Sequence, residues 1–218
     1  MQQEFWFARW ERDEIGFHQP DGNALLPRHW ERLGLTSEAR VLVPLCGKTP
    51  DLAWLARQGH AVVGVELSEK AATDFFREHG VTPQQRRCDG FTVLSGAGVD
   101  IWVGDFFAMP DAVLAECSGL YDRASLIALP PPMRHSFADQ LTRAMPADAR
   151  GLLISICYPE EEMDGPPFSV TEDEIGQRFE PSWQVIPLEC NDALAGNPQL
   201  QDRGLSALLE SAYFLRKR

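Results

Sequence analysis

Two apolar runs constrain the fold of this chain most: the first is broken by a glycine, and the second ends in a glutamate. Residues 41–48 read VLVPLCGK, so the first run breaks at Gly47, and the second run, residues 62–66, ends in Glu66, nineteen residues further on. Strand, glycine turn, helix and acid-ended strand follow one another in this order in βαβ units that bind adenosine. The pattern predicts a ligand crevice at the carboxyl ends of two neighbouring parallel strands.

The glycine turn does not match the motifs that bind phosphate. A phosphate loop needs a second glycine five residues before Gly47, where this chain has Leu42, and the dinucleotide fingerprint needs three glycines where this turn has one. We therefore expect a cofactor that carries adenosine without phosphates, and S-adenosylmethionine fits that description. Glu66 is then placed to accept hydrogen bonds from the ribose hydroxyls; its alternative role is that of an acid at the start of the next helix.

Strands and helices are expected to alternate along the chain, which indicates an α/β fold with a doubly wound, mostly parallel sheet. Asp51 and Ser68 are expected to cap the two helices that follow the first two strands, which Gly59 and Gly80 end. The expected strands cover residues 41–45, 61–65, 100–103, 119–123 and 151–158, with an antiparallel edge pair at 183–190 and 208–215; the other expected helices cover 5–12, 24–33, 134–145 and a short segment after Thr171. Residues 159–167 are expected to form a solvated loop.

Charge and cysteine content exclude several classes of function. The formal net charge is −12 and the basic residues are dispersed, so we expect neither a nucleic-acid nor a membrane partner. The first ten residues lack a signal-peptide pattern, and no stretch reaches the roughly 18 apolar residues of a membrane span. The five cysteines are widely spaced, which predicts reduced thiols in the cytoplasm and no metal site. We expect one domain, residues 1–218.

Several short motifs together are similar to those of the thiopurine S-methyltransferase family, in its bacterial branch. The matching segments, which run from Trp10 almost to the end of the chain, are GFHQ at 16–19, PLCGK at 44–48, GHxVVGVExSE at 59–69, DRxxL at 122–126 and GPPF at 165–168. The resemblance implies a class I S-adenosylmethionine-dependent methyltransferase fold, in which residues 1–34 cover the cofactor and residues 35–218 form a Rossmann-like core. It implies S-methylation of aromatic and heterocyclic thiols, and it leaves open whether selenium or tellurium oxyanions are also acceptors in detoxification. We expect a monomer.

The resemblance also implies roles for particular residues. Arg123 is the catalytic candidate; it lines the reaction chamber and contacts both cofactor and substrate. Trp10 is expected to cover the cofactor, Leu45 to contact its methionine part through the backbone, and Glu66 to bind its ribose. Asp105 and Phe106 are expected to contact the adenine, and Phe17 the substrate ring.

Several of these residues have a simpler alternative. Arg123 could form a surface ion pair with the preceding acid, and Trp6, Trp10 and Phe17 could be core packing. Cys46 is interpreted as structural, because no histidine lies in the turn to activate it. Two other functions stay open at this point: a non-catalytic adenosine-binding regulatory module and an NAD-type oxidoreductase. We hypothesise that Arg123 stabilises the developing thiolate and that the N-terminal segment orders over the bound cofactor.

Overall fold

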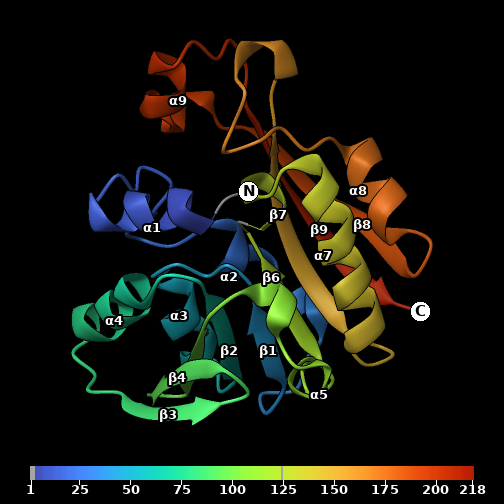
Figure 1. Ribbon diagram of the computed structural model, residues 1–218. Helices are drawn as coiled ribbons and strands as arrows, with labels where there is room; N and C mark the ends of the chain where they lie inside the picture. The colour runs from blue at the N-terminus through green and yellow to red at the C-terminus, as the bar shows by residue number, and fades with distance from the viewer. Residues whose placement is uncertain (1–2, 124) are drawn as a thin grey trace.

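One mixed sheet forms the centre of the molecule (Figure 1). Residues 3–123 and 125–218 are described in this computed structural model, and within them nine strands pair in the order β3-β4-β5-β2-β1-β6-β7-β9-β8. Neighbouring strands are parallel from β5 to β7, and antiparallel pairs flank this centre on both sides. The strands are β1 Arg40–Val43, β2 Ala61–Glu66, β3 Gln84–Cys88, β4 Phe91–Gly96, β5 Val99–Val103, β6 Gly119–Asp122, β7 Arg150–Cys157, β8 Trp183–Asp192 and β9 Leu209–Lys217.

Helices cover both faces of the sheet, and none of those in the described ranges is long and apolar enough to cross a membrane. In Figure 1, α7 and α8 lie on one side of the sheet and α3 and α4 on the other. The α-helices are α1 Gln3–Glu11, α2 Leu25–His29, α3 Asp51–Arg57, α4 Glu69–Glu78, α5 Asp111–Leu114, α6 Ser125–Ala128, α7 Pro131–Ala144, α8 Glu172–Phe179 and α9 Pro198–Asp202, and the 3-10 helices are η1 Trp30–Leu33, η2 Phe106–Ala108, η3 Glu160–Glu162 and η4 Leu194–Gly196.

The continuous apolar sequence of β1 reflects burial on both of its faces. Leu42 packs into the core beneath α7 and α8, whereas Val41 and Val43 pack into the core beneath α2, α3 and α4. All three side chains are at most 3% exposed. A parallel strand covered by helices on both sides requires apolar residues at successive positions, so the predicted doubly wound sheet is confirmed.

The predicted helix ends are confirmed except at Asp51. Ser68 caps α4 through its side-chain oxygen, which accepts a hydrogen bond from the backbone of Ala71, and Gly59 and Gly80 follow their helices with positive φ angles of 96° and 66°. Pro50, however, occupies the N-cap position of α3. The prediction that Asp51 caps this helix is wrong, because its buried carboxylate binds groups from other segments instead.

The sequence pattern did not predict the hairpin formed by β3 and β4, nor the short helices α5, α6 and α9. The sequence of β3 is QQRRC, with its side chains exposed or half-buried at the edge of the sheet, so it lacks the alternation of a half-buried strand. Its pairing comes from β4, which bonds to β5 on its other side. At the opposite edge, the expected antiparallel pair is confirmed as β9 and β8.

Candidate active site

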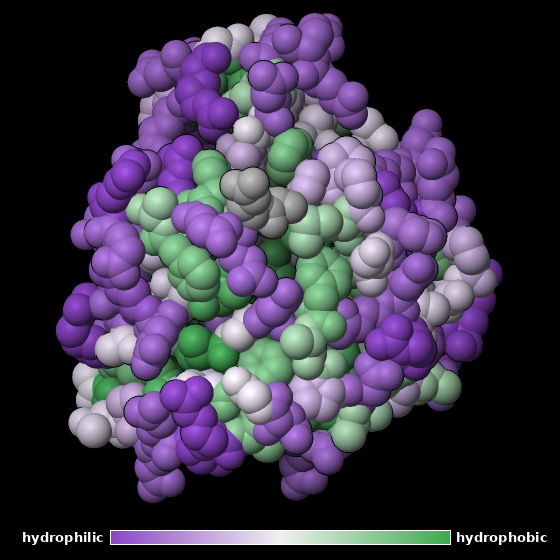
Figure 2. Space-filling view, in the orientation of Figure 1, coloured by the Kyte–Doolittle hydropathy of each residue, from purple (hydrophilic) through white to green (hydrophobic). Residues whose placement is uncertain are grey.

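A cavity of about 880 Å³ opens where the carboxyl ends of the central parallel strands meet the N-terminal segment. Its walls come from α1, residues 16–22, the turn after β1, the ends of β2, β6 and β7, the loop at Pro166 and Pro167, and α9. Figure 2 shows apolar side chains gathered around a hollow near the middle of this face, within a mostly hydrophilic surface. Carboxyl ends of parallel strands are the general place for ligands in doubly wound sheets.

The turn after β1 brings Gly47 against Glu66, as the spacing predicted. Glu66 Oε2 accepts a hydrogen bond from the Gly47 backbone N–H at 2.8 Å, and the Cys46 N–H donates to the Val65 carbonyl at 3.0 Å. Leu45 and Gly47 both adopt left-handed backbone angles, with φ values of 47° and 55°. Leu45 is not a glycine, so its conformation is held by the surrounding bonds rather than by its own preference.

Glu66 supports the start of the next helix and also faces the cavity. Its Oε1 accepts a hydrogen bond from the Ser68 N–H at 2.8 Å, so it does support the start of α4. The side chain is only 6% exposed yet lines the cavity, and each carboxylate oxygen has a second lone pair that these backbone bonds leave unused. Burial raises the pKa of Glu66 above its ordinary value of 4.5, and the backbone N–H groups of Ser68, Gly47 and Leu67 oppose that rise.

Trp10 lies directly over the turn. A Cβ placed on Gly47 would be 3.1 Å from the Trp10 ring, so only glycine lets the ring approach this closely. Trp10 also meets the Phe17 ring edge-on at 5.6 Å, and Phe17 meets Trp6 at 5.5 Å. Trp10 is buried, whereas Phe17 is 36% exposed on the cavity wall. These aromatic residues therefore pack on one another and form a wall of the cavity at the same time.

Asp105 and Phe106 lie at the far side of Glu66, after β5. The Asp105 carboxylate caps η2 through the Phe107 N–H and also accepts a hydrogen bond from the side chain of Gln3 at 3.0 Å, which ties α1 to this edge of the cavity. Phe106 is nearly buried, packs against Phe137 at 5.0 Å and still contributes to the cavity lining. Both residues line the same cavity as Glu66.

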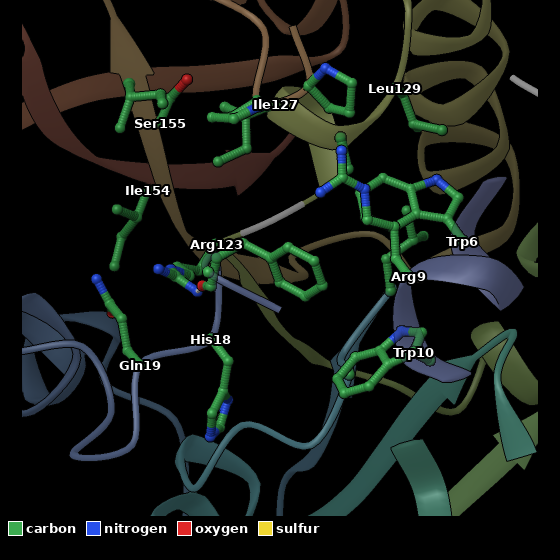
Figure 3. Close-up of a pocket in the computed structure, with 18 of the residues that line it drawn as sticks. Trp6, Arg9, Trp10, His18, Gln19, Arg123, Ile127, Leu129, Ile154 and Ser155 are labelled. Carbon is green, nitrogen blue, oxygen red and sulfur yellow. Dashed lines mark hydrogen bonds between the residues drawn. The ribbon is translucent and has the colours of Figure 1, made fainter. Parts of the chain in front are cut away.

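The cavity has two halves: the cofactor half lies next to the turn after β1 and Glu66, and the acceptor half lies next to Ile154 and Ser155. Arg123 projects between them, from the end of β6 (Figure 3). Its Nη1 donates a hydrogen bond to the Phe17 backbone carbonyl at 3.2 Å. In Figure 3, Trp6, Arg9 and Trp10 lie on one side of Arg123, and Ile154 and Ser155 lie on the other. The side chain therefore links β6 to residues 16–23 across the cavity, which gives it a role beyond that of a solvent-exposed ion pair.

Two titratable side chains near the turn are held in their neutral forms. Burial, with a smaller contribution from the Glu66 charge, raises the pKa of the Cys46 thiol well above its ordinary value, so this thiol stays protonated and is no nucleophile. Burial first and then the Lys48 charge lower the pKa of His18, so its imidazole is neutral near pH 7. Lys48 itself is bonded to Glu78 at 2.7 Å.

The donors and acceptors of this turn fit S-adenosylmethionine. The buried carboxylate of Glu66 suits ribose hydroxyls, the backbone at Leu45 and Gly47 suits a polar amino-acid end, and Phe106 offers an apolar face for a base. The only lysine of the turn is directed to Glu78 rather than toward a phosphate. The expectation of an adenosine site without phosphates therefore agrees with the geometry.

The other half of the cavity contains residues for which the sequence predicted no role. Pro166 and Pro167 line it, so the loop expected to be solvated in fact forms part of its wall, and Gln199 of α9 packs over Gly16. Ile154, Ser155 and Glu210 also line the cavity, from β7 and β9. Ile154 and Ser155 lie near the carboxyl end of a predicted central strand, which was the available signal; nothing in the sequence indicated Glu210.

Comparisons with known proteins agree with this geometry. The family model for Thiopurine S-methyltransferase (TPMT) matches residues 1–218. The chain belongs to the thiopurine S-methyltransferase family. A thiopurine S-methyltransferase from Azotobacter vinelandii is 50% identical over 218 residues, and one from Pseudomonas paraeruginosa is 49% identical over 217 residues, each covering 100% of both chains.

Solved structures support the fold. An S-adenosylmethionine-dependent methyltransferase from Anabaena variabilis superposes with a TM-score of 0.70 at 14% identity, covering 99% of this chain and 95% of its own. A Haemonchus contortus phosphoethanolamine N-methyltransferase, solved with S-adenosylhomocysteine, gives 0.66 at 12% identity, covering 91% and 53%. The predicted family, class I methyltransferase fold, enzyme class and S-adenosylmethionine cofactor are thereby confirmed. The competing regulatory-module and oxidoreductase interpretations are set aside.

Proposed function

We propose that this enzyme methylates the sulfur of thiopurines and related aromatic or heterocyclic thiols. The observation that supports this most is the position of Arg123 and Phe17, which face the cavity beyond the turn that fits the cofactor. Phe17 offers a partly exposed aromatic surface for a flat ring, and Arg123 offers a cation for an anionic sulfur. Curated relatives of nearly half-identical sequence carry the same activity in their names.

The cofactor half of the cavity is assigned to five residues. Glu66 would hold the ribose and the backbone at Leu45 the methionine part, while Phe106 would contact the adenine and Trp10 would cover the site. Arg123 would lie between cofactor and acceptor. S-adenosylmethionine supplies an activated methyl group when bound, so the protein needs chiefly to align the acceptor and to exclude water.

Arg123 is proposed as the catalytic residue. Thiols attack as thiolates, and aromatic thiols ionise readily, so a strong protein base is unnecessary. A guanidinium stays protonated throughout the accessible pH range and favours the anionic form of a nearby sulfur, directly or through a water that takes its proton. Its bond to the Phe17 carbonyl would keep it aimed at the acceptor.

The cellular setting is part of the same proposal. We infer that the enzyme is a monomer of one domain that acts in the cytoplasm on small molecules, and on neither nucleic acids nor membranes. The net charge of −12 argues against anionic partners, and the free cysteines in the described chain fit a reducing compartment. Selenium and tellurium oxyanions are proposed as further acceptors in detoxification.

The test is methyl transfer from radiolabelled S-adenosylmethionine to a panel of thiopurines, selenite and tellurite. Replacing Arg123 by Ala should lower turnover of a thiopurine about 10- to 100-fold, as expected for the loss of one charge-assisted contact, while calorimetry shows the affinity for S-adenosylhomocysteine unchanged within a few-fold. Arg87→Ala, at an exposed position on the edge strand β3, is the matched control. A wild-type enzyme that methylates no thiol would reject the function, and an Arg123→Ala enzyme with normal turnover would remove Arg123 from the mechanism.

A further inference from the structure

Asp51 is a buried carboxylate that joins three segments around the cavity without lining it. The side chain, 4% exposed, extends from the first residue of α3. Its Oδ2 accepts a hydrogen bond from the Tyr121 hydroxyl at 2.7 Å, and its Oδ1 accepts one from the Asn23 backbone N–H at 3.1 Å. Burial, together with the Asp51 charge, raises the pKa of Tyr121 well above its ordinary value, so the phenol remains a donor.

The Asn23 bond fixes one end of residues 16–23, which we call the acceptor loop. Gly22 approaches so closely that a Cβ on it would be 2.4 Å from Asp51 Oδ1, and its φ of 77° is itself left-handed. The Asn23 side chain extends the anchor, because its Nδ2 donates to Glu210 at 2.9 Å and to Gln19 at 3.3 Å. This end of the loop is therefore held mainly by buried or half-buried polar contacts.

The Tyr121 bond fixes the strand that carries Arg123. Tyr121 lies two residues before Arg123, and Arg123 bonds to the Phe17 carbonyl in the acceptor loop at 3.2 Å. Asp51 thus holds both partners of that contact: the loop through Asn23 and the strand end through Tyr121. A shift of either partner would change the distance between Phe17 and Arg123, the two residues assigned to the acceptor.

We propose that Asp51 is a positioning residue that sets the acceptor half of the cavity by anchoring the acceptor loop to β6. It acts through Asn23 and Tyr121 and touches neither ligand. The inference rests on the proposed function for its kinetic readout. Changing Asp51 should therefore alter the KM for the acceptor and leave the affinity for the cofactor unchanged.

The test is Asp51→Asn, which keeps the shape of the side chain but has only one acceptor oxygen for two donors. We expect the KM for a thiopurine to rise about 5- to 20-fold, as for a misplaced substrate-positioning contact, while the dissociation constant for S-adenosylhomocysteine stays within about twofold. Amide hydrogen exchange should accelerate in residues 14–24 and stay unchanged in α4 and β1. Asp111→Asn makes the same substitution at the exposed first residue of α5 and should change none of these quantities.

Gly22→Ala perturbs the same contact from the acceptor loop, because the added Cβ would clash with the Asp51 carboxylate. This variant provides the test if the Asp51 variant does not fold. It should also raise the acceptor KM selectively, and the double variant should be little worse than the more affected single variant. An unchanged acceptor KM in folded variants, an equal loss of cofactor affinity, or faster exchange throughout the protein would overturn the inference. If wild-type enzyme methylates no thiol, the proposed function fails, whereas the exchange and cofactor measurements still test the anchor.

Discussion

Replacing Glu66 by Gln tests the ribose assignment with the smallest change in shape. In the wild type, each carboxylate oxygen accepts one backbone N–H, from Gly47 and from Ser68, and has a lone pair left for a ribose hydroxyl. The amide keeps one acceptor oxygen and loses the charge. The amide can therefore accept from only some of these donors. The ribose hydroxyls must compete with the backbone N–H groups of Gly47 and Ser68 for its single oxygen.

The magnitude follows from the contacts that are lost. A hydrogen bond to a charged group contributes about 1.5–3 kcal/mol, so losing one such bond should weaken the binding of S-adenosylhomocysteine about 10- to 100-fold. Calorimetry at pH 7.5 measures this directly. Glu69→Gln makes the same change at an exposed position three residues away, at the start of α4, and should leave the affinity unaltered.

The pH dependence gives a second readout. Because burial raises the pKa of Glu66 above 4.5, acidification should protonate it before an exposed glutamate, and cofactor affinity should fall as the pH drops through that raised value. The stability of the free enzyme should depend on pH in the opposite direction. The folded state holds this proton more tightly than the unfolded state, so the contribution of Glu66 to stability is complete below 4.5 and is lost as the pH rises through the raised pKa. Glu66→Gln should remove both trends.

An unchanged affinity in Glu66→Gln, with the same pH profile as the wild type, would refute the ribose role. Glu66 would then serve only to connect the turn to the start of α4 through its two backbone hydrogen bonds. A melting temperature that falls without a change in affinity would point to the same conclusion, because the backbone bonds would account for the whole effect.

The remaining predictions concern the turn and its cover. Cys46→Ala should keep thiopurine turnover within about threefold, because burial keeps the thiol protonated; a loss of a hundredfold would contradict its structural role. Gly47→Ala should cost about 1–2 kcal/mol of stability for its left-handed angle and weaken S-adenosylhomocysteine binding by displacing Trp10, measured by thermal melting and calorimetry. Hydrogen exchange in residues 5–20 should slow when S-adenosylhomocysteine binds; equal exchange with and without it would reject ordering of this segment over the cofactor.

Within the cofactor half, the turn after β1 and Glu66 were predictable because they are close together in the sequence, whereas Trp10, Phe106 and Arg123 came only from the family resemblance. Val41 to Gly47 and the run ending at Glu66 belong to one βαβ unit, and the buried strands read as continuous apolar sequence. The helix ends at Ser68 and Gly80 were also local signals. Asp51 was misassigned for the same reason: a helix-start acid looks like a cap, and its actual partners lie far away in the sequence.

The acceptor half depends on contacts that no local pattern contains. Arg123 bonds to Phe17 across 106 residues, and Asn23 bonds to Glu210 across 187 residues. Both contacts join segments that are distant in the sequence, so they depend on the tertiary arrangement rather than on periodicity. The resemblance to a family supplied Arg123 and Phe17, but not the network through Asp51 that holds them.

The two halves therefore differ in how a substitution can act on them. In the cofactor half, Glu66 braces the turn and faces the cavity with the same carboxylate, so a change there alters the fold of the turn together with binding. In the acceptor half, the wall residues come from separate segments joined by single hydrogen bonds, at Arg123, Asn23 and Asp51. All three bonds are made by side chains and none belongs to the backbone pairing of the sheet. Acceptor preference should consequently respond to single substitutions that leave cofactor binding untouched, which is the separation of KM and affinity that the Asp51 variant measures.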